Sequence, residues 1–173
     1  MLRLLLLLPL LFGCGYRFVG APSLPEGMRS IAIGEFQNLT AEPQLDSLLR
    51  RALREEFTFR GVSLVKSKEA DATLEGRVMR ISFRSLAYDE SARARQYRAT
   101  LQVDLRLVRD RRVLWEGRGL TETETFNVRG DVILDDEAKD RALRKMAEDL
   151  AEEVYLRLAT GLCSPSRSSS TSQ

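Results

Sequence analysis

The sequence predicts an α+β fold: a two-layer sandwich in which two helices pack on one face of a mainly antiparallel four-stranded sheet. Several segments alternate apolar and polar residues, a period that indicates strands. Two others place apolar residues at three- and four-residue steps, a period that indicates amphipathic helices. The elements follow in the order strand, helix, strands, helix, so both helices can cover the same face of the sheet.

The first 13 residues are predicted to be removed before the protein folds. A short charged start, Met1 to Arg3, precedes a leucine run that ends at Phe12 and is followed by Gly13 and Cys14. The run is far shorter than the roughly 20 residues that span a bilayer as a permanent helix. This pattern is typical of a secretory signal peptide, and no later segment is apolar enough to span a membrane.

The residues around Cys14 predict a lipid anchor. The order Leu11, Phe12, Gly13, Cys14 resembles the lipobox of bacterial lipoproteins, although Phe12 is larger than usual at its position. We therefore expect diacylglycerol and an N-acyl chain such as palmitate on Cys14. Gly15 stands where enterobacterial lipoproteins retained in the inner membrane carry aspartate, so the resemblance implies the periplasmic side of the outer membrane. The alternative is an ordinary secretory signal in which Cys14 is incidental.

The first half of the mature chain predicts a strand and a helix. Arg29 to Phe36 alternates as a strand does, and Thr40 is expected to cap a helix from Pro43 to Arg60, with Pro43 in its first turn. Gly61 supplies the residue that usually closes a helix. Val62 to Val65 is predicted to be a short extended stretch.

Three further strands are predicted to form a meander, over Ala70–Ser85, Tyr97–Leu107 and Val113–Phe126. In the first of them the apolar residues change from even-numbered to odd-numbered positions between Val78 and Met79, which predicts a bulge of one extra residue. The second alternates cleanly, so one of its faces should be exposed to water or to a partner. That face carries Arg98, Thr100, Gln102, Asp104 and Arg106.

A long helix from about Ile133 to Thr160 is predicted to end the fold, because acidic residues crowd its start and Gly161 follows it. Residues 14–162 are therefore expected to form a single domain. The Ser-rich segment 163–173 has almost no apolar content and is predicted to be a disordered tail. With Cys14 acylated, Cys163 has no partner for an intramolecular disulfide.

Composition argues for binding and against catalysis. Removal of the signal leaves 26 of the 27 basic residues against 25 acidic ones, so the strong basic excess of a nucleic-acid binder is missing. Histidine is absent, and no nucleophile elbow, glycine-rich loop or cysteine cluster is present, so we expect no enzyme activity, cofactor or metal. Glu122 and Glu124 share one face of a strand, and we interpret them as a solvated face rather than a catalytic pair.

Among the polar residues, the arginines give the clearest indication of a ligand, because a planar guanidinium binds phosphate or carboxylate with paired hydrogen bonds. The alternative is a solvent face balanced by nearby carboxylates. The arginines fall in the strands and turns of the predicted meander: Arg77, Arg80, Arg84, Arg93, Arg95, Arg98, Arg106, Arg109, Arg111 and Arg112.

Taken in order, many residues resemble the lipopolysaccharide-assembly lipoprotein family LptE. The matching residues are Cys14, Gly15, Tyr16 and Phe18, then Leu24, Pro25, Ile31, Ile33, Phe36, Asn38, Thr40, Glu42 and Pro43, followed by Leu48–Phe57, Ala70–Gly76, Tyr88, Tyr97, Val113–Gly119 and the last helix.

The resemblance implies a plug inside the outer-membrane β-barrel LptD that assists assembly of the barrel and binds lipopolysaccharide during delivery to the cell surface. It also implies the same sandwich fold and lipid attachment at Cys14. No sharp motif carries over the family's lipopolysaccharide-binding residues. We nominate Arg93, Arg95 and Arg98 from their charge and their place between two long strands.

Two other functions stay open at this point. One is a lipoprotein that regulates a peptidoglycan synthase of the inner membrane. Such proteins usually carry a long spacer after the cysteine, whereas here the first strand begins within about 15 residues. A fully extended segment of that length reaches about 50 Å at most, which favours a partner in the same membrane. An envelope hydrolase is the other, and the missing histidine and nucleophile motifs argue against it.

Overall fold

The computed structural model describes Leu24, residues 27–88, Glu90 and residues 94–161. The signal segment, Cys14, Arg93, Cys163 and the Ser-rich segment lie outside these residues. The predictions made for them stay predictions.

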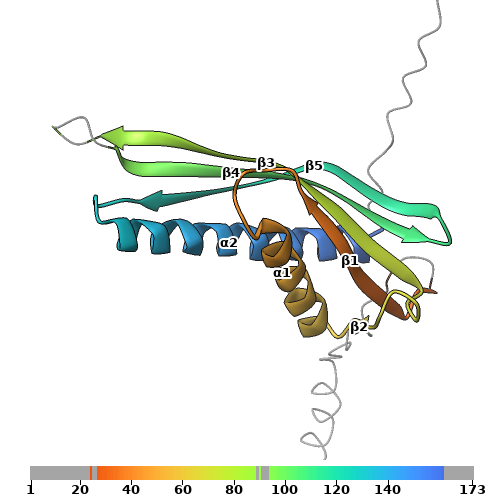
Figure 1. Ribbon diagram of the computed structural model, residues 1–173. Coiled ribbons are helices and arrows are strands. Elements are labelled where there is room, and N and C mark those ends of the chain that lie inside the picture. The colour runs from red at the N-terminus through yellow and green to blue at the C-terminus, as the bar shows by residue number, and fades with distance from the viewer. Residues whose placement is uncertain (1–23, 25–26, 89, 91–93, 162–173) are drawn as a thin grey trace, which may run out of the picture.

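Five strands form one mixed sheet in the order β2-β1-β3-β4-β5 (Figure 1). β1 is parallel to both β2 and β3, whereas β3, β4 and β5 form a long antiparallel meander. The predicted α+β class and element order are confirmed, but the sheet has five strands, not four. The fifth is a two-residue strand, too short for periodicity to reveal. The bounds are β1 (Ser30–Asn38), β2 (Ser63–Leu64), β3 (Ala72–Tyr88), β4 (Ala94–Arg109) and β5 (Arg112–Asn127).

Both helices, α1 (Leu45–Phe59) and α2 (Val132–Ala159), pack on the same side of the sheet (Figure 1). We call this side the inner face and the opposite side the outer face. Leu49 and Leu53 of α1 and Val154 of α2 are completely buried in one core cluster with the inner residues of β4. Phe57 and Tyr155 join the two helices edge to face, with ring centroids 5.8 Å apart.

The bulge predicted from the phase flip is present in β3. Val78 pairs with Val103 and Arg80 pairs with Gln102, so Met79 is the extra residue. Beyond it Ile81 pairs with the buried Leu101, and the inner face of β3 therefore remains apolar past the bulge. The bulge thus places the apolar residues before and after it on the same face of the sheet.

The start of α2 is confirmed and the start of α1 is corrected. Asp131 caps α2, and its carboxylate accepts hydrogen bonds from the Ile133 and Leu134 amides at 3.0 and 3.1 Å. α1 begins at Leu45, after Gln44 in the left-handed region, and not at Pro43 with Thr40 as its cap. The Thr40 hydroxyl instead accepts from the Glu42 amide in a local turn, an arrangement that competes with capping.

Gly76 provides a test of the packing where β1, β3 and β4 meet. A Cβ at this position would lie 2.5 Å from both Leu105 Cδ2 and Phe36 Cε1. Because Phe36 is buried, we expect Gly76→Ala to lower the free energy of unfolding by about 1–3 kcal/mol. Denaturant unfolding measures the loss. Adding Phe36→Leu should recover part of it, and an unchanged unfolding midpoint for Gly76→Ala would contradict this packing.

Candidate anion-binding site

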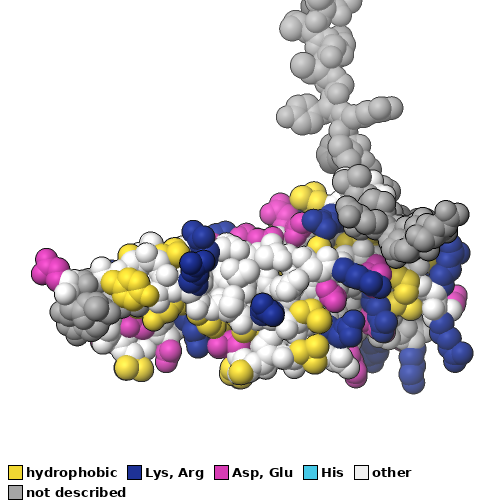
Figure 2. All heavy atoms as spheres, turned by 90° about the horizontal axis from the view of Figure 1, so that it is seen from above, with side chains coloured by type: hydrophobic (Ala, Val, Ile, Leu, Met, Phe, Trp, Pro, Cys, Tyr) yellow, Lys and Arg dark blue, Asp and Glu magenta, His cyan; other side chains and the backbone are white. Residues whose placement is uncertain are grey.

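The outer face of the meander carries a regular grid of polar side chains. The three strands pair in register so that Arg80, Gln102 and Thr121 form one row, Ser82, Thr100 and Thr123 the next, and Arg84, Arg98 and Thr125 the third. We call these nine residues the distal outer face. In the view onto this side, the middle of the sheet shows few apolar or acidic side chains (Figure 2).

Two arginines stand directly opposite each other in this grid. Arg84 of β3 pairs with Arg98 of β4, and both side chains are exposed. Like charges in directly opposed positions destabilise a strand pair. Within the described part of the chain, Arg80, Arg84 and Arg98 have no ion pair to offset this repulsion. The geometry therefore concentrates positive charge that an external anion could neutralise.

Nearer the other end of the same face, the arginines are matched by carboxylates. The Arg106 guanidinium lies 2.8 Å from Glu75, and that of Arg77 lies 4.0 Å from Asp104. These residues line a shallow hollow of about 350 Å³. The balanced solvent face considered from the sequence thus describes this half of the face but not the distal half.

The distal outer face has the chemistry to bind phosphate or carboxylate. Guanidinium groups donate paired hydrogen bonds to such anions, and hydroxyls such as those of Ser82 and Thr100 can add single ones. Arg84, Arg98 and Thr125 are exposed on the surface of the sheet. The site therefore suits the charged group of a large amphiphile better than a small metabolite, which needs a concave pocket.

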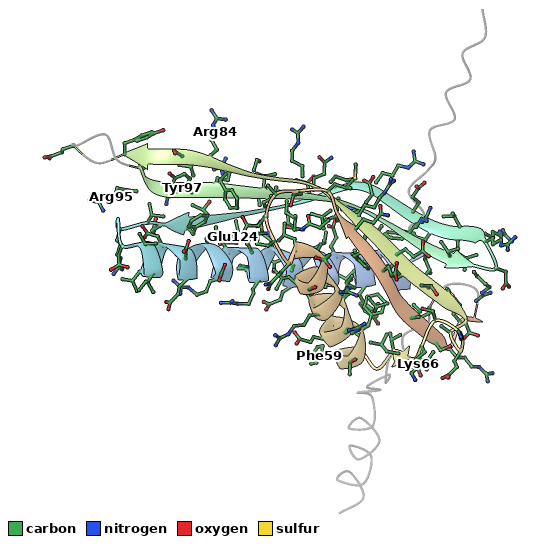
Figure 3. The ribbon with its side chains drawn as sticks, viewed as in Figure 1. Phe59, Lys66, Arg84, Arg95, Tyr97 and Glu124 are labelled. Atoms are coloured by element: carbon green, nitrogen blue, oxygen red, sulfur yellow. The ribbon has the colours of Figure 1, made fainter. Side chains whose placement is uncertain are left out.

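The structure separates the nominated arginines. Arg98 lies on the distal outer face, while Arg95 Nη1 donates to the Arg129 carbonyl at 2.9 Å, at the corner where β5 leads into α2. Figure 3 shows Arg84 rising from the outer face and Arg95 beside the start of α2. Arg93 is outside the described residues. The nomination omitted Arg84, which only the pairing register brings opposite Arg98.

Glu122 and Glu124 are not on a solvated face, so that interpretation was wrong. They pair with Leu101 and Ala99, and this places them half-buried on the inner face, toward α2 (Figure 3). Burial raises the pKa of Glu122, and the negative charges of Glu153 and Asp149 raise it further, although Lys145 acts in the opposite direction. The seam between β5 and α2 is therefore partly charged.

A groove of about 450 Å³ lies between the end of β5 and the first half of α2. Its lining carries both signs of charge, with Glu124 and Asp135 against Arg141 and Lys145, so it does not select an anion as the distal outer face does. Among the described residues, no cluster of three or more Cys, Asp or Glu side chains could hold a metal ion. No helix in the described ranges is long and apolar enough to cross a membrane.

Comparisons with known proteins find one family. The family model of LptE, described as lipopolysaccharide-assembly, matches residues 28–158. A comparison with curated protein sequences finds no match.

Several solved structures with a similar fold are described as lipoproteins. The rare lipoprotein B of Shewanella oneidensis superimposes with a TM-score of 0.56 at 10% identity, covering 77% of this chain and 96% of that one. Lipoprotein B of Nitrosomonas europaea gives a TM-score of 0.54 at 17% identity, covering 86% and 92%. A protein of Caulobacter crescentus CB15 described as a lipoprotein gives 0.53 at 22% identity, covering 73% and 89%. At these identities the likeness concerns the fold alone.

The half-buried carboxyl of Glu122 makes stability depend on pH. A carboxyl whose pKa is higher in the folded than in the unfolded state stabilises the fold below its ordinary value of 4.5 and loses that contribution as the pH rises through the folded value. We therefore expect Glu122→Gln to raise the thermal unfolding midpoint at neutral pH, and the gain to disappear below the ordinary value.

Glu148→Gln is the matched control, because Glu148 is exposed on the same helix, α2. It should change the midpoint little at either pH. Equal gains in the two variants would mean that loss of a negative charge, not burial of Glu122, is responsible.

Proposed function

The chain belongs to the LptE family of lipopolysaccharide-assembly lipoproteins, and from this premise we propose that it plugs the β-barrel LptD, helps it assemble and binds lipopolysaccharide during delivery to the cell surface. Its place would be the periplasmic side of the outer membrane, held by acyl chains on Cys14. The mature protein would be a single domain, residues 14–162, followed by a disordered tail.

The observation that carries lipopolysaccharide binding is that Arg84 and Arg98 face each other across β3 and β4 and that neither has an ion pair among the described residues. Lipopolysaccharide bears phosphate and carboxylate groups, the anions that arginine binds with paired hydrogen bonds. Binding such a group would remove the repulsion between the two guanidiniums. The anion would therefore stabilise the folded protein as well as attach to it.

The nominated residues Arg93, Arg95 and Arg98 remain candidates for this site. Arg98 is its centre, and Arg84 joins it from β3. Arg95 lies at the end of the sheet, at the β5–α2 corner, where it could contact a more distant group of the same large ligand.

The one-sided fold also supports a role as a plug. The helices cover the inner face, and the outer face presents hydroxyl, amide and charged groups along strands of about 50 Å, at roughly 3.3 Å per residue. The lumen of an outer-membrane barrel is polar, so a polar outer face could pack within it without burying unmatched apolar surface. The role is binding and assembly, with no reaction step.

Replacing both opposed arginines should separate ligand binding from stability. We expect Arg84→Ala with Arg98→Ala to weaken binding of purified lipopolysaccharide by about ten- to a hundredfold, because charge-assisted hydrogen bonds are lost. The free energy of unfolding without ligand should stay the same or rise by up to about 1 kcal/mol. Fluorescence titration and denaturant unfolding of the chain carrying Cys14→Ser measure the two effects.

Arg77→Ala with Arg106→Ala is the matched control, since it removes the same charge from the same face but from ion-paired positions. Equal weakening by both double variants would show that net charge alone attracts the ligand. A third variant with Arg93, Arg95 and Arg98 changed to alanine tests the nominated set, which is wrong if binding is unaffected.

The partner can be identified by purification from native outer membranes. We expect the acylated chain to co-purify in detergent with one large β-barrel at a one-to-one ratio, and Cys14→Ser to abolish palmitate labelling and membrane attachment. An inner-membrane synthase as the stoichiometric partner would instead indicate the peptidoglycan regulator, and recovery of the chain alone would contradict the plug. An amino terminus that begins upstream of Cys14 in the mature protein would contradict lipid attachment.

A further inference from the structure

The turn between β4 and β5 places arginine where the backbone disfavours it. Arg109 and Arg112 pair across the hairpin, and the two residues between them, Asp110 and Arg111, have φ values of 48° and 67°. This is the geometry of a two-residue turn that prefers Asn-Gly or Asp-Gly, because both central residues adopt positive φ. Arg111 stands in the position that glycine would fill without strain.

The charges at the same turn add a second unfavourable feature. Arg109 and Arg112 are directly opposite each other, and like charges in this position destabilise the strand pair. Arg111 and Arg112 are both exposed. Arg109 is held by Asp71, whereas Arg111 and Arg112 project from the turn, where an external anion could neutralise their charge.

The rest of this end of the molecule is also basic. The space-filling view shows Lys and Arg side chains gathered at the end where β4 and β5 meet (Figure 2). The turn, the start of β1 and the segment between β2 and β3 contribute Arg29, Lys66, Lys68, Arg109, Arg111 and Arg112 against Glu69, Asp71 and Asp110. We call these nine residues the basic end.

Hydrogen bonds place the basic end beside the start of the folded chain. Arg109 Nε donates to the Asp71 carbonyl at 3.0 Å, and the Asp71 carboxylate accepts from the Arg29 amide at 2.8 Å. Leu24, a few residues earlier, is already buried in the core. Leu24 is ten positions after Cys14 in the chain, which limits the distance between them to about 35 Å at full extension.

We propose that the basic end is a membrane contact, at which Arg111 and Arg112 rest on anionic phospholipid headgroups of the bilayer that holds the Cys14 acyl chains. This inference rests on the proposed lipid attachment, since the short connection keeps this end of the sheet near the membrane surface. The attraction would orient the protein, with the distal outer face and the start of α2 directed away from the anchoring leaflet. A polybasic segment next to a lipid anchor strengthens membrane binding in this way.

Vesicle binding of the chain from residue 14 with Cys14→Ser tests the contact without the acyl chains. We expect this protein to co-sediment with vesicles of phosphatidylethanolamine and phosphatidylglycerol, but not with phosphatidylethanolamine and phosphatidylcholine, and to be released by salt. Arg111→Gly with Arg112→Gln should lower the partition coefficient roughly fivefold for each charge removed. The same variant should unfold no more easily, because glycine suits the turn.

Arg51→Gln with Arg144→Gln is the control of equal charge, because both residues are exposed on the helices. It should bind the anionic vesicles as the parent does. Equal binding by the hairpin variant and the parent, or binding that ignores vesicle charge, would overturn the proposal. So would a hairpin variant that loses binding to lipopolysaccharide micelles but keeps binding to vesicles. The Arg84 and Arg98 variant should retain vesicle binding, so this test and the lipopolysaccharide test can fail separately.

Discussion

The packing of α2 along the inner face of the β3–β4–β5 meander is the interaction on which the rest of the structure depends. Strands of 16 and 17 residues form a ribbon that needs an apolar cover on at least one face to be stable in water. α2 has 28 residues, about 42 Å of helix at 1.5 Å per residue, and packs mainly along β5 at the edge of that ribbon. Since α1 packs on the same side, the outer face of the meander remains open to binding.

The contact between α2 and the sheet differs between the two halves of the helix. In its second half α2 buries Leu150, Val154 and Leu158 against the sheet, and burial of this kind supplies most of the stability. In the first half, Glu124 of β5 lines a groove with Arg141 and Lys145 of α2, and Val132 and Ile133 are exposed. The contact between α2 and the sheet is therefore apolar around Leu150, Val154 and Leu158 and more polar toward the start of α2.

Arginines with and without ion pairs also lie in different parts of the molecule. Ion pairs such as that between Arg106 and Glu75 neutralise one half of the outer face, and within the described residues exposed arginine without an ion pair remains in two separate places. One is the distal outer face, centred on Arg84 and Arg98, and the other is the turn at Arg111. Both arrangements are locally unfavourable in the isolated chain. At each of these places an external anion could neutralise the charge.

The sequence by itself determined the element order, the two amphipathic helices and the β3 bulge, because periodicity along a chain reports which side chains must be buried together. It also determined the signal pattern ahead of Cys14. Only the tertiary structure decided that Arg84 faces Arg98 and that Glu122 faces α2. A two-residue period assigns side chains to a face but does not fix the register between strands, which depends on turn length and bulges. The segment joining β3 to β4 has no turn signal of the Asn-Gly kind, so the register, and with it the candidate site, could not be read from the sequence.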